Sequence, residues 1–318
     1  MELIPTREAC ARTLVELGRE NPDVVVFEAD IAKSTKTLYF AKEFPERFFE
    51  MGIAEQNMMA AAAGMATTGK LPFVSTYSVF ASMRACEQIR TFICYPNLNV
   101  KIVASHGGLT PGNDGPTHQA IEDLGIMRSI PNMTVLMPAD AVATRALVRA
   151  AAEWKGPVYV RLTRDPVPVI YDEGTNFTIG KAVEFRPGSD VTIIAIGDMV
   201  AWSAQAAEEL EKEGISARVL DVHTVKPMDK EAVLKAAKET GALVTVEDHN
   251  IYGGLGSAVA EVVAEECLVP LKRVGIPDTF AESGEYKLLL EKYGLGVENI
   301  KQAVKEVLER KRALGGGS

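Results

Sequence analysis

Short apolar runs rich in β-branched residues alternate along the first half of the chain with longer segments of helical period. VVVFEAD at 24–30, VKIVAS at 100–105 and PVYVRLT at 157–163 predict strands, and ATRALVRAAAEW at 143–154 predicts the helix before the third strand. Almost continuously apolar strands that alternate with helices are typical of a buried, mostly parallel sheet. We therefore expect the first half to be a doubly wound α/β domain.

The second half repeats this alternation. Its predicted elements are, in order, the strand VTIIAIG at 191–197, a helix over 200–213, the strand ARVLDV at 217–222, a helix over 229–239, the strand ALVTVED at 242–248, a glycine turn and a further helix. The same reasoning predicts a second doubly wound α/β domain here.

Between the two halves the sequence changes to RDPVPVIYDEGTNFTIG over 164–180. Closely spaced prolines followed by glycines forbid a continuous helix and predict an exposed connector. We expect a first domain over 1–166, a linker over 167–180 and a second domain over 181–318. A chain of 318 residues is long for one hydrophobic core, which also favours two domains.

The composition is that of an ordinary globular protein, with 47% hydrophobic and 24% charged residues. A net charge of -9 without any Lys/Arg cluster argues against a nucleic-acid partner. The sequence does not open with a basic leader and apolar stretch, and no apolar run approaches the roughly 18 residues of a membrane span. The cytoplasm is the expected compartment, and the terminal GGGS resembles a frayed tail or a linker.

The cysteines do not have metal-binding spacing. Cys10, Cys86, Cys94 and Cys267 contain no CxxC pair, and the first two stand among helix-forming residues. Buried thiols are therefore expected in preference to disulfides or a metal site on this chain.

Two glycine-rich stretches resemble phosphate-binding motifs incompletely. GMATTGK at 64–70 has P-loop spacing up to its Lys, but Leu71 stands where a Ser or Thr is needed, and a helical segment precedes it. GGLGSA at 253–258 follows a strand, yet Val259 replaces the third glycine of the dinucleotide fingerprint. A tight strand-to-helix turn is the better interpretation of the second stretch.

Glu55 is the first candidate for chemistry. It lies within FFEMGIAEQNMMAAAAGMATTG at 48–69, after a small Ala and ahead of an Ala-rich apolar helix. A carboxylate at this position faces a packed interior or an interface. Helix N-termini favour anions, so a plain capping role is the alternative.

Two further stretches carry candidate residues. PFVSTYSVFASMRACEQIR at 72–90 places Tyr77, Phe80 and Met83 at positions i, i+3 and i+6, which predicts the first turns of a helix, with core packing as the alternative. HGGLTPGNDGPTHQAIEDLG at 106–125 is a long loop dense in Gly and Pro, and such loops tend to be functional.

Within that loop, Asn-Asp-Gly-Pro fixes the backbone so that Asp114 and His118 can be aimed at one ligand. A capping Asp beside a surface His is the alternative.

Taken together, these motifs resemble the C-terminal half of transketolase, which consists of a pyrimidine-binding domain of the thiamine-diphosphate-binding fold followed by a small C-terminal domain. The likeness runs from about residue 7 to residue 310. GIAEQN, the STY with the following Phe, and DGPTHQ at 114–119 occur in the family's order, which is more specific than any of them alone.

The resemblance implies that Glu55 hydrogen-bonds the aminopyrimidine nitrogen of thiamine diphosphate and promotes its imino tautomer, which removes the thiazolium proton. Tyr77 and Phe80 match the aromatic pair that packs on the pyrimidine, with Tyr77 as the stacking ring. Met83 departs from an aromatic residue often found there, although its thioether can still contact the ring.

The resemblance also implies a sugar-phosphate site. Asp114 and His118 match the pair that contacts the donor hydroxyls and assists proton movement. The phosphate-binding cluster corresponds to Arg7, Ser34, His106 and Arg164. Taken singly, either Arg could form an ordinary surface ion pair. No catalytic counterpart is assigned to His223 or His249.

Family members that act as one chain carry a further domain whose GDG motif and later Asn hold Mg²⁺ and the diphosphate. This sequence contains no GDG. The resemblance therefore implies an N-terminal partner subunit that binds the diphosphate with Mg²⁺ or Ca²⁺, in an α2β2 heterotetramer.

The implied function is a subunit of a thiamine-diphosphate-dependent transketolase, a transferase of the pentose phosphate pathway that moves a two-carbon ketol unit between sugar phosphates. One alternative is a subunit of a 1-deoxy-D-xylulose-5-phosphate synthase, which His106 disfavours. A 2-oxo acid dehydrogenase β-subunit and a non-catalytic assembly subunit are the others. The retained polar residues argue against the assembly subunit.

Overall fold

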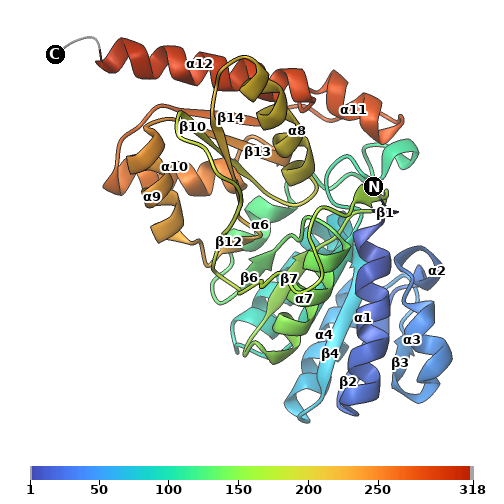
Figure 1. Ribbon diagram of the computed structural model, residues 1–318. Coiled ribbons are helices and arrows are strands. Elements are labelled where there is room, and N and C mark those ends of the chain that lie inside the picture. The colour runs from blue at the N-terminus through green and yellow to red at the C-terminus, as the bar shows by residue number, and fades with distance from the viewer. Residues whose placement is uncertain (1, 316–318) are drawn as a thin grey trace.

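The structure is a computed structural model that describes residues 2–315, so the end of the GGGS tail from residue 316 lies outside the described residues. Two sheets, each flanked by helices, follow one another along the chain (Figure 1). The long C-terminal helix packs against the second sheet, far from the blue strands of the first. The predicted pair of α/β sheets is confirmed.

The first sheet has seven strands in the order β12-β6-β7-β5-β4-β2-β3. All neighbours pair in parallel except β12, which is antiparallel to β6. In chain order its strands are β2 (Val24–Glu28), β3 (Phe48–Glu50), β4 (Leu71–Tyr77), β5 (Lys101–Ser105), β6 (Thr134–Leu136), β7 (Val158–Arg161) and β12 (Thr224–Lys226). The three strands predicted in this half are therefore present and parallel.

Helices and short turns cover both faces of the first sheet (Figure 1). They are α1 (Thr6–Glu20), α2 (Ala32–Thr35), α3 (Leu38–Glu43), η1 (Pro45–Arg47), α4 (Glu55–Thr67), η2 (Phe80–Arg84), α5 (Cys86–Gln88), η3 (Ile89–Cys94), η4 (Gly112–Asp114), α6 (Asp123–Ser129) and α7 (Ala141–Glu153). The aromatic stripe begins at the end of β4 and continues in η2, so the predicted helical turns are present and have π geometry. π-Helical turns are rare and occur often at functional sites.

The second sheet has five strands in the order β14-β13-β10-β11-β9, with only β9 antiparallel. Its strands are β9 (Val183–Arg186), β10 (Val191–Ala195), β11 (Ala217–Asp221), β13 (Leu243–Asn250) and β14 (Leu271–Ile276). The helices around it are α8 (Met199–Lys212), α9 (Lys230–Thr240), α10 (Leu255–Glu266), α11 (Tyr286–Lys292) and α12 (Val297–Gly315). Every strand and helix predicted for this half is present.

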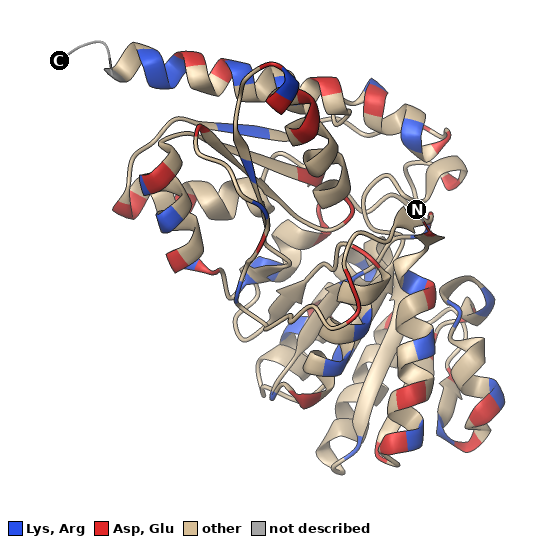
Figure 2. Cartoon of the chain, in the orientation of Figure 1, with Lys and Arg blue, Asp and Glu red and all other residues tan. Residues whose placement is uncertain are grey.

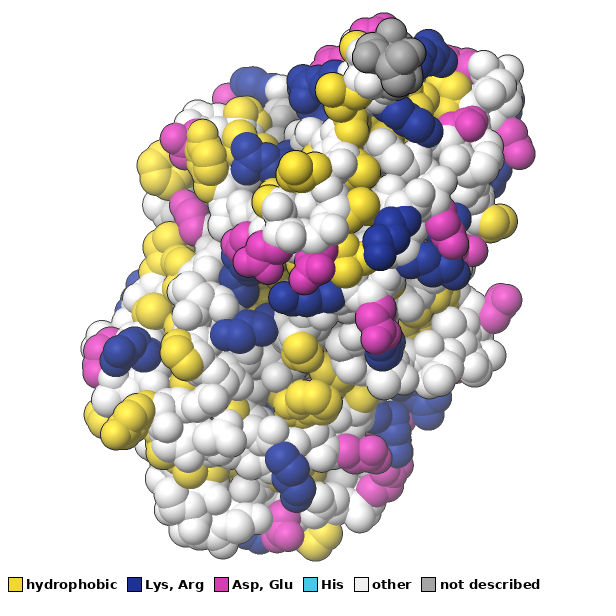
Figure 3. All heavy atoms as spheres, turned by 90° about the vertical axis from the view of Figure 1, so that its left-hand side faces the viewer, with side chains coloured by type: hydrophobic (Ala, Val, Ile, Leu, Met, Phe, Trp, Pro, Cys, Tyr) yellow, Lys and Arg dark blue, Asp and Glu magenta, His cyan; other side chains and the backbone are white. Residues whose placement is uncertain are grey.

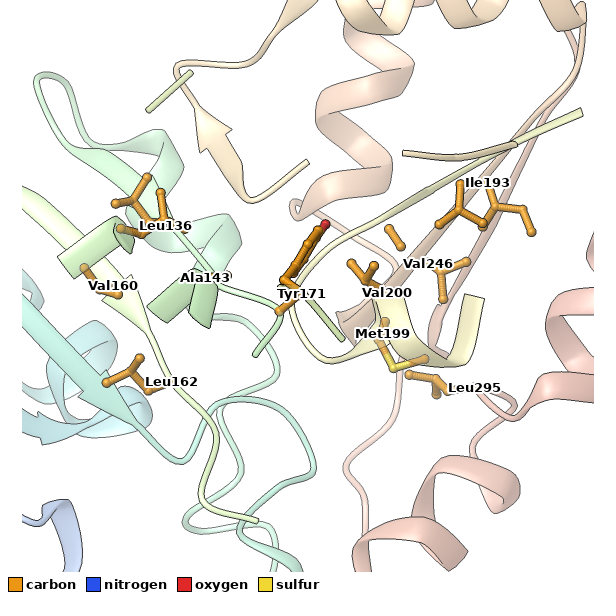
Figure 4. Close-up of a cluster of buried hydrophobic side chains, with 14 of the residues drawn as sticks. Leu136, Ala143, Val160, Leu162, Tyr171, Ile193, Met199, Val200, Val246 and Leu295 are labelled. Carbon is orange, nitrogen blue, oxygen red and sulfur yellow. The ribbon is translucent and has the colours of Figure 1, made fainter. Parts of the chain in front are cut away.

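The two halves are joined through backbone pairing and a shared core. β12 comes from the second half of the chain but pairs with β6 at the edge of the first sheet. At the start of the linker, β8 (Val167–Pro168) pairs with β1 (Leu3–Ile4) near the N-terminus. One cluster of buried apolar side chains extends from Leu136 and Val160 past Tyr171 to Val200 (Figure 4). The linker is therefore partly built into the core, and the division at 167–180 stays a prediction.

The surface carries charges of both signs. Basic and acidic side chains follow one another along α12 (Figure 2), where Lys301 donates to Glu209 and Glu298. On the face shown in Figure 3, charged side chains are interspersed with apolar ones. None of the helices in the described part of the chain has both the length and the apolar character needed to cross a bilayer.

All four cysteines are free thiols, two buried (Cys10 and Cys94) and two partly exposed (Cys86 and Cys267). Burial raises the pKa of Cys10 and Cys94 to about 12, so these thiols stay protonated. Within residues 2–315, no group of His, Cys, Asp and Glu side chains has the arrangement of a metal site.

Asp140 fastens the linker to the first domain. This fully buried carboxylate caps α7, where Oδ1 accepts from the Ala143 amide at 2.8 Å. Its Oδ2 accepts from the amides of Ile170 and Tyr171 at 2.8 and 2.9 Å. One side chain thus satisfies a helix end and two amides of the connector.

We predict that Asp140→Ala lowers the free energy of unfolding by about 2–4 kcal/mol, because a helix cap is lost and buried amides are left unpaired. Urea titration of the purified chain measures the change. Asp172→Ala, at an exposed position of the same linker, is the control and should change stability by less than about 0.5 kcal/mol. Equal losses in both variants would contradict this account of Asp140.

Candidate active site

The residues predicted to carry chemistry gather at the carboxyl ends of neighbouring parallel strands. Tyr77 is the last residue of β4, and His106 follows the last residue of β5. Ser34 lies in the short helix α2 after β2, and Arg164 lies three residues after β7. Ligands of open α/β sheets bind in the crevice outside the carboxyl ends of the strands. The sheet thus delivers residues far apart in sequence to one edge.

Glu55 is the first residue of α4 and is only 3% exposed. Arg84, at the end of η2, donates from Nη1 to Glu55 Oε1 at 2.7 Å, and its guanidinium lies 4.3 Å from the centre of the Phe80 ring. Glu55 Oε2 is buried and has no hydrogen-bond partner among the described residues. A buried acceptor without a partner is costly unless a ligand completes it.

The aromatic residues form a compact group. The Tyr77 and Phe80 rings stack with centroids 5.6 Å apart, and the His106 ring lies 3.8 Å from that of Tyr77. The His118 ring packs edge-to-face with both aromatic rings, and its centroid lies 5.8 Å from that of Tyr77 and 5.6 Å from that of Phe80. Met83 takes part in none of these contacts, and its side chain is 48% exposed.

His106 is fully buried and has a positive φ of 65°, a backbone conformation uncommon for residues other than glycine. Burial lowers its pKa to about 2, and the cations Arg7 and Arg164 act in the same direction. The imidazole is therefore neutral at physiological pH. Its Nδ1 lies 2.9 Å from Ser105 Oγ, whereas the buried Nε2 has no partner among the described residues.

Two arginines stand beside this histidine. Arg7 donates from Nη1 to Ser34 Oγ at 3.3 Å, and the Tyr77 hydroxyl donates to the same oxygen at 2.9 Å. Burial lowers the pKa of Arg7, and the nearby Arg164 cation lowers it further. Two cations held this close repel each other, and a bound anion would relieve that repulsion.

Arg164 also reaches the loop that carries Asp114 and His118. Its Nε lies 3.7 Å from Asp114 Oδ2, and its Nη1 donates to the Pro111 carbonyl at 3.2 Å. Asp114 is exposed, and His118 shares a 2.9 Å hydrogen bond with the Thr117 hydroxyl. The structure therefore joins seven of the ten predicted residues in one set of contacts, namely Glu55, Phe80, Tyr77, His106, His118, Ser34 and Arg7. Arg164 and Asp114 form a separate pair beside it, and Met83 lies outside both.

Two residues of this neighbourhood were not predicted from sequence. Arg84 was overlooked because its contact with Glu55 depends on the π-helical turn. Glu28 is buried, and burial raises its pKa to about 7. It accepts from the hydroxyls of Thr35 and Thr37 at 2.7 and 2.5 Å, which holds the turn that carries Ser34. A Glu that ends an apolar strand before a Thr-rich turn was the available signal.

The buried polar atoms without a hydrogen-bond partner indicate which hydrogen-bonding groups a ligand of this site must carry. Glu55 Oε2 and His106 Nε2 lie at the two ends of the aromatic group, and Arg7 Nε is a third such atom. An aminopyrimidine presents ring and amino nitrogens to a carboxyl group, and a phosphate presents acceptors to guanidinium and imidazole groups. The residues present therefore fit a thiamine-type cofactor beside a phosphorylated substrate.

The two glycine-rich stretches have other roles. Residues 64–70 span the end of α4 and the turn into β4, so they are not a strand-to-helix phosphate loop. At the start of α10, the amides of Leu255 and Gly256 both donate to Glu247 at 2.7 Å. A side chain of the protein already occupies the place of an anion, which supports the interpretation as a tight turn.

Comparison with known proteins agrees with this geometry. Residues 2–169 match the family described as "Transketolase, pyrimidine binding domain", and residues 180–300 match "Transketolase, C-terminal domain". A "Putative transketolase C-terminal section" of Methanocaldococcus jannaschii is 50% identical over 96% of both chains. A 6-deoxy-6-sulfo-D-fructose transketolase subunit of Clostridium sp. (strain MSTE9) is 46% identical over 96% of this chain and 95% of its own.

A solved structure is equally similar. "Split gene transketolase, inactive beta4 tetramer" superposes with a TM-score of 0.92 at 54% identity and covers 97% of this chain and 100% of its own. The pyrimidine-binding match covers the first sheet except for β12, and the C-terminal match covers the second. The chain therefore belongs to the transketolase family and combines its pyrimidine-binding domain with its C-terminal domain.

Proposed function

We propose that this chain is one subunit of a thiamine-diphosphate-dependent transketolase, which transfers a two-carbon ketol unit from a ketose phosphate to an aldose phosphate. The observation that carries the proposal is the buried, half-satisfied carboxylate of Glu55. Contacts run from it through Arg84, Phe80, Tyr77 and Ser34 to Arg7. A cofactor-activating acid and an anion site thus lie at opposite ends of one aromatic surface.

At the cofactor end, Glu55 would hydrogen-bond the aminopyrimidine through Oε2, while Tyr77 and Phe80 pack against its ring. Thiamine diphosphate, when bound, supplies the nucleophilic carbon that accepts the ketol unit. Arg84 neutralises the Glu55 charge and keeps its carboxyl group in place. Met83 would add an apolar contact from the rim of the site.

At the substrate end, the cationic cluster would hold the terminal phosphate of the sugar. Arg7 and Arg164 supply charge, and Ser34 and the neutral His106 supply hydrogen bonds. Asp114 and His118 would contact the donor hydroxyls and move protons during cleavage and transfer. A sulfonate presents an anion much as a phosphate does, so the cluster would also accept a sulfosugar of the kind named for the Clostridium relative.

The partner is part of this proposal. Two relatives that match this chain over nearly their whole length are named as a section and a subunit of transketolase. We infer an N-terminal subunit that binds the diphosphate with Mg²⁺ or Ca²⁺, in an α2β2 assembly, with the cytoplasm and the pentose phosphate pathway as its setting. No metal is assigned to the present chain.

The first prediction concerns the reaction. Mixed with its partner subunit, Mg²⁺ and thiamine diphosphate, the chain should form sedoheptulose 7-phosphate from xylulose 5-phosphate and ribose 5-phosphate, as followed by chromatography of the products. Formation of deoxyxylulose phosphate from pyruvate and glyceraldehyde 3-phosphate would select the synthase alternative instead. Inactivity with both substrate pairs and with a sulfosugar donor would leave the assembly subunit as the better account.

Glu55→Gln should lower turnover in the complex by about 100-fold or more, because an amide cannot exchange a proton with the pyrimidine as a carboxyl group does. The substitution preserves side-chain size, so the thermal unfolding midpoint of the isolated chain should change little. Initial rates and a thermal melt measure the two quantities. Full activity in this variant would remove Glu55 from the mechanism.

Arg164→Ala should raise the KM for a phosphorylated ketose by about 10-fold or more, because one charged hydrogen-bond donor to phosphate is lost. The KM for hydroxypyruvate, a ketol donor without phosphate, should stay within about twofold. Arg145→Ala, which removes an exposed partner of Glu16, is the matched control. Equal changes for both donors would refute a phosphate-binding role for Arg164.

A further inference from the structure

The loop of residues 106–121, which carries three of the proposed substrate-contacting residues, is held by both halves of the chain. Several of its hydrogen-bond partners lie more than 120 residues away in the sequence. Gln119 donates to the Glu282 carbonyl, and the Asn250 amide donates to the Ile121 carbonyl. The first sheet alone therefore does not fix the conformation of this loop.

Asp248 is the main contact. It lies in β13, is fully buried, and accepts from the Leu109 amide with both carboxylate oxygens, at 3.1 and 2.9 Å. Gly108 has a φ of +60°, and a Cβ at this position would overlap the Asp248 carboxylate. The double glycine after His106 thus allows a carboxylate from the other sheet to approach the backbone closely.

Arg161 holds the end of the loop from the first sheet, and we call Asp248 and Arg161 together the clamp. Its Nη2 donates to the carbonyls of Ala120 and Asp248 at 2.7 and 3.0 Å, and its Nε donates to Asp123 at 2.9 Å. A Cβ at Gly107 would lie 2.5 Å from Arg161 Nε. The loop is therefore held near its start by Asp248 and at its end by Arg161, two buried side chains from the two sheets.

A second acid lies behind Asp248. The Tyr286 hydroxyl, from α11, donates to Asp198 and also lies 3.4 Å from Asp248 Oδ2. Burial raises the pKa of Asp248 to about 8, and the nearby Asp198 raises it further. Burying ionisable groups is unfavourable unless they are hydrogen-bonded, so local packing alone gives no reason for this cluster.

We propose that Asp248 is a positioning residue through which the C-terminal domain sets the substrate loop, by holding the Leu109 amide and so fixing His106, Asp114 and His118 relative to the cofactor end of the site. This inference rests on the proposed function for its kinetic consequences. The mechanical part concerns the loop alone and can be measured without turnover.

The test compares Asp248→Asn with Asp221→Asn. Asp221 is an equally buried acid on β11 that accepts from Tyr171, so it matches the general effect of replacing a buried carboxyl group without touching the loop. In the isolated chain, hydrogen exchange at the Leu109 amide should become about 10-fold faster in Asp248→Asn and stay unchanged in Asp221→Asn. Equal exchange in the two variants would overturn the proposal.

In the complex with the partner subunit, Asp248→Asn should raise the KM for the ketose phosphate or lower kcat/KM by about 10- to 100-fold, because small displacements of substrate-contacting groups have effects of that size. The Kd for thiamine diphosphate should stay within about twofold, since Glu55, Tyr77 and Phe80 lie outside the loop. A parallel loss of cofactor affinity would indicate general damage and contradict the proposal.

If Asp248→Asn does not fold, Tyr286→Phe tests the proposal in its place. This variant removes only the hydroxyl group that contacts Asp198 and Asp248. It should change Leu109 exchange and the ketose KM in the same direction by a smaller factor. No change in either quantity would refute the proposal. If neither the parent complex nor any variant turns over sugar phosphates while Leu109 exchange responds as stated, the proposed function fails and the clamp stands.

Discussion

Parallel pairing of β2, β4, β5 and β7 is the constraint on which the rest of the site depends. Parallel strands place their carboxyl ends at one edge, so residues as far apart as Ser34 and Arg164 become neighbours there. The edge is also where backbone hydrogen bonding ends and side chains must satisfy the loops that follow. Glu28 does so for the turn after β2, and Arg161 does so for the loop after β5.

The site combines groups whose charges are unfavourable when they are isolated. Burial and the nearby Arg164 cation lower the pKa of Arg7, and the ring of the neutral His106 packs against that of Tyr77. Glu55 is compensated on one oxygen by Arg84 and left open on the other. Such arrangements are stable as part of a larger fold and become favourable locally when a ligand supplies the missing partners.

Much of the fold was predictable because nearly continuous apolar strands signal a parallel sheet, and VVVFEAD, VKIVAS and VTIIAIG all became strands with a neighbour on each side. The predicted site residues could be named because their motifs are local, as in GIAEQN and DGPTHQ. Contacts between distant residues were out of reach: Asp248 and Leu109 stand 139 positions apart, and neither has a distinctive neighbourhood. The π-helical turn that brings Arg84 to Glu55 has no periodic signal of its own.

The strand β12 has a consequence for the independence of the two halves. It lies at the outer edge of the first sheet and covers the backbone groups of β6 with its own. A chain shortened to its first half would expose that edge as a row of unpaired amides and carbonyls, ready to pair with a strand of another molecule. The second half thus shields the edge of the first sheet from pairing with other molecules, so the two sheets depend on remaining on one polypeptide.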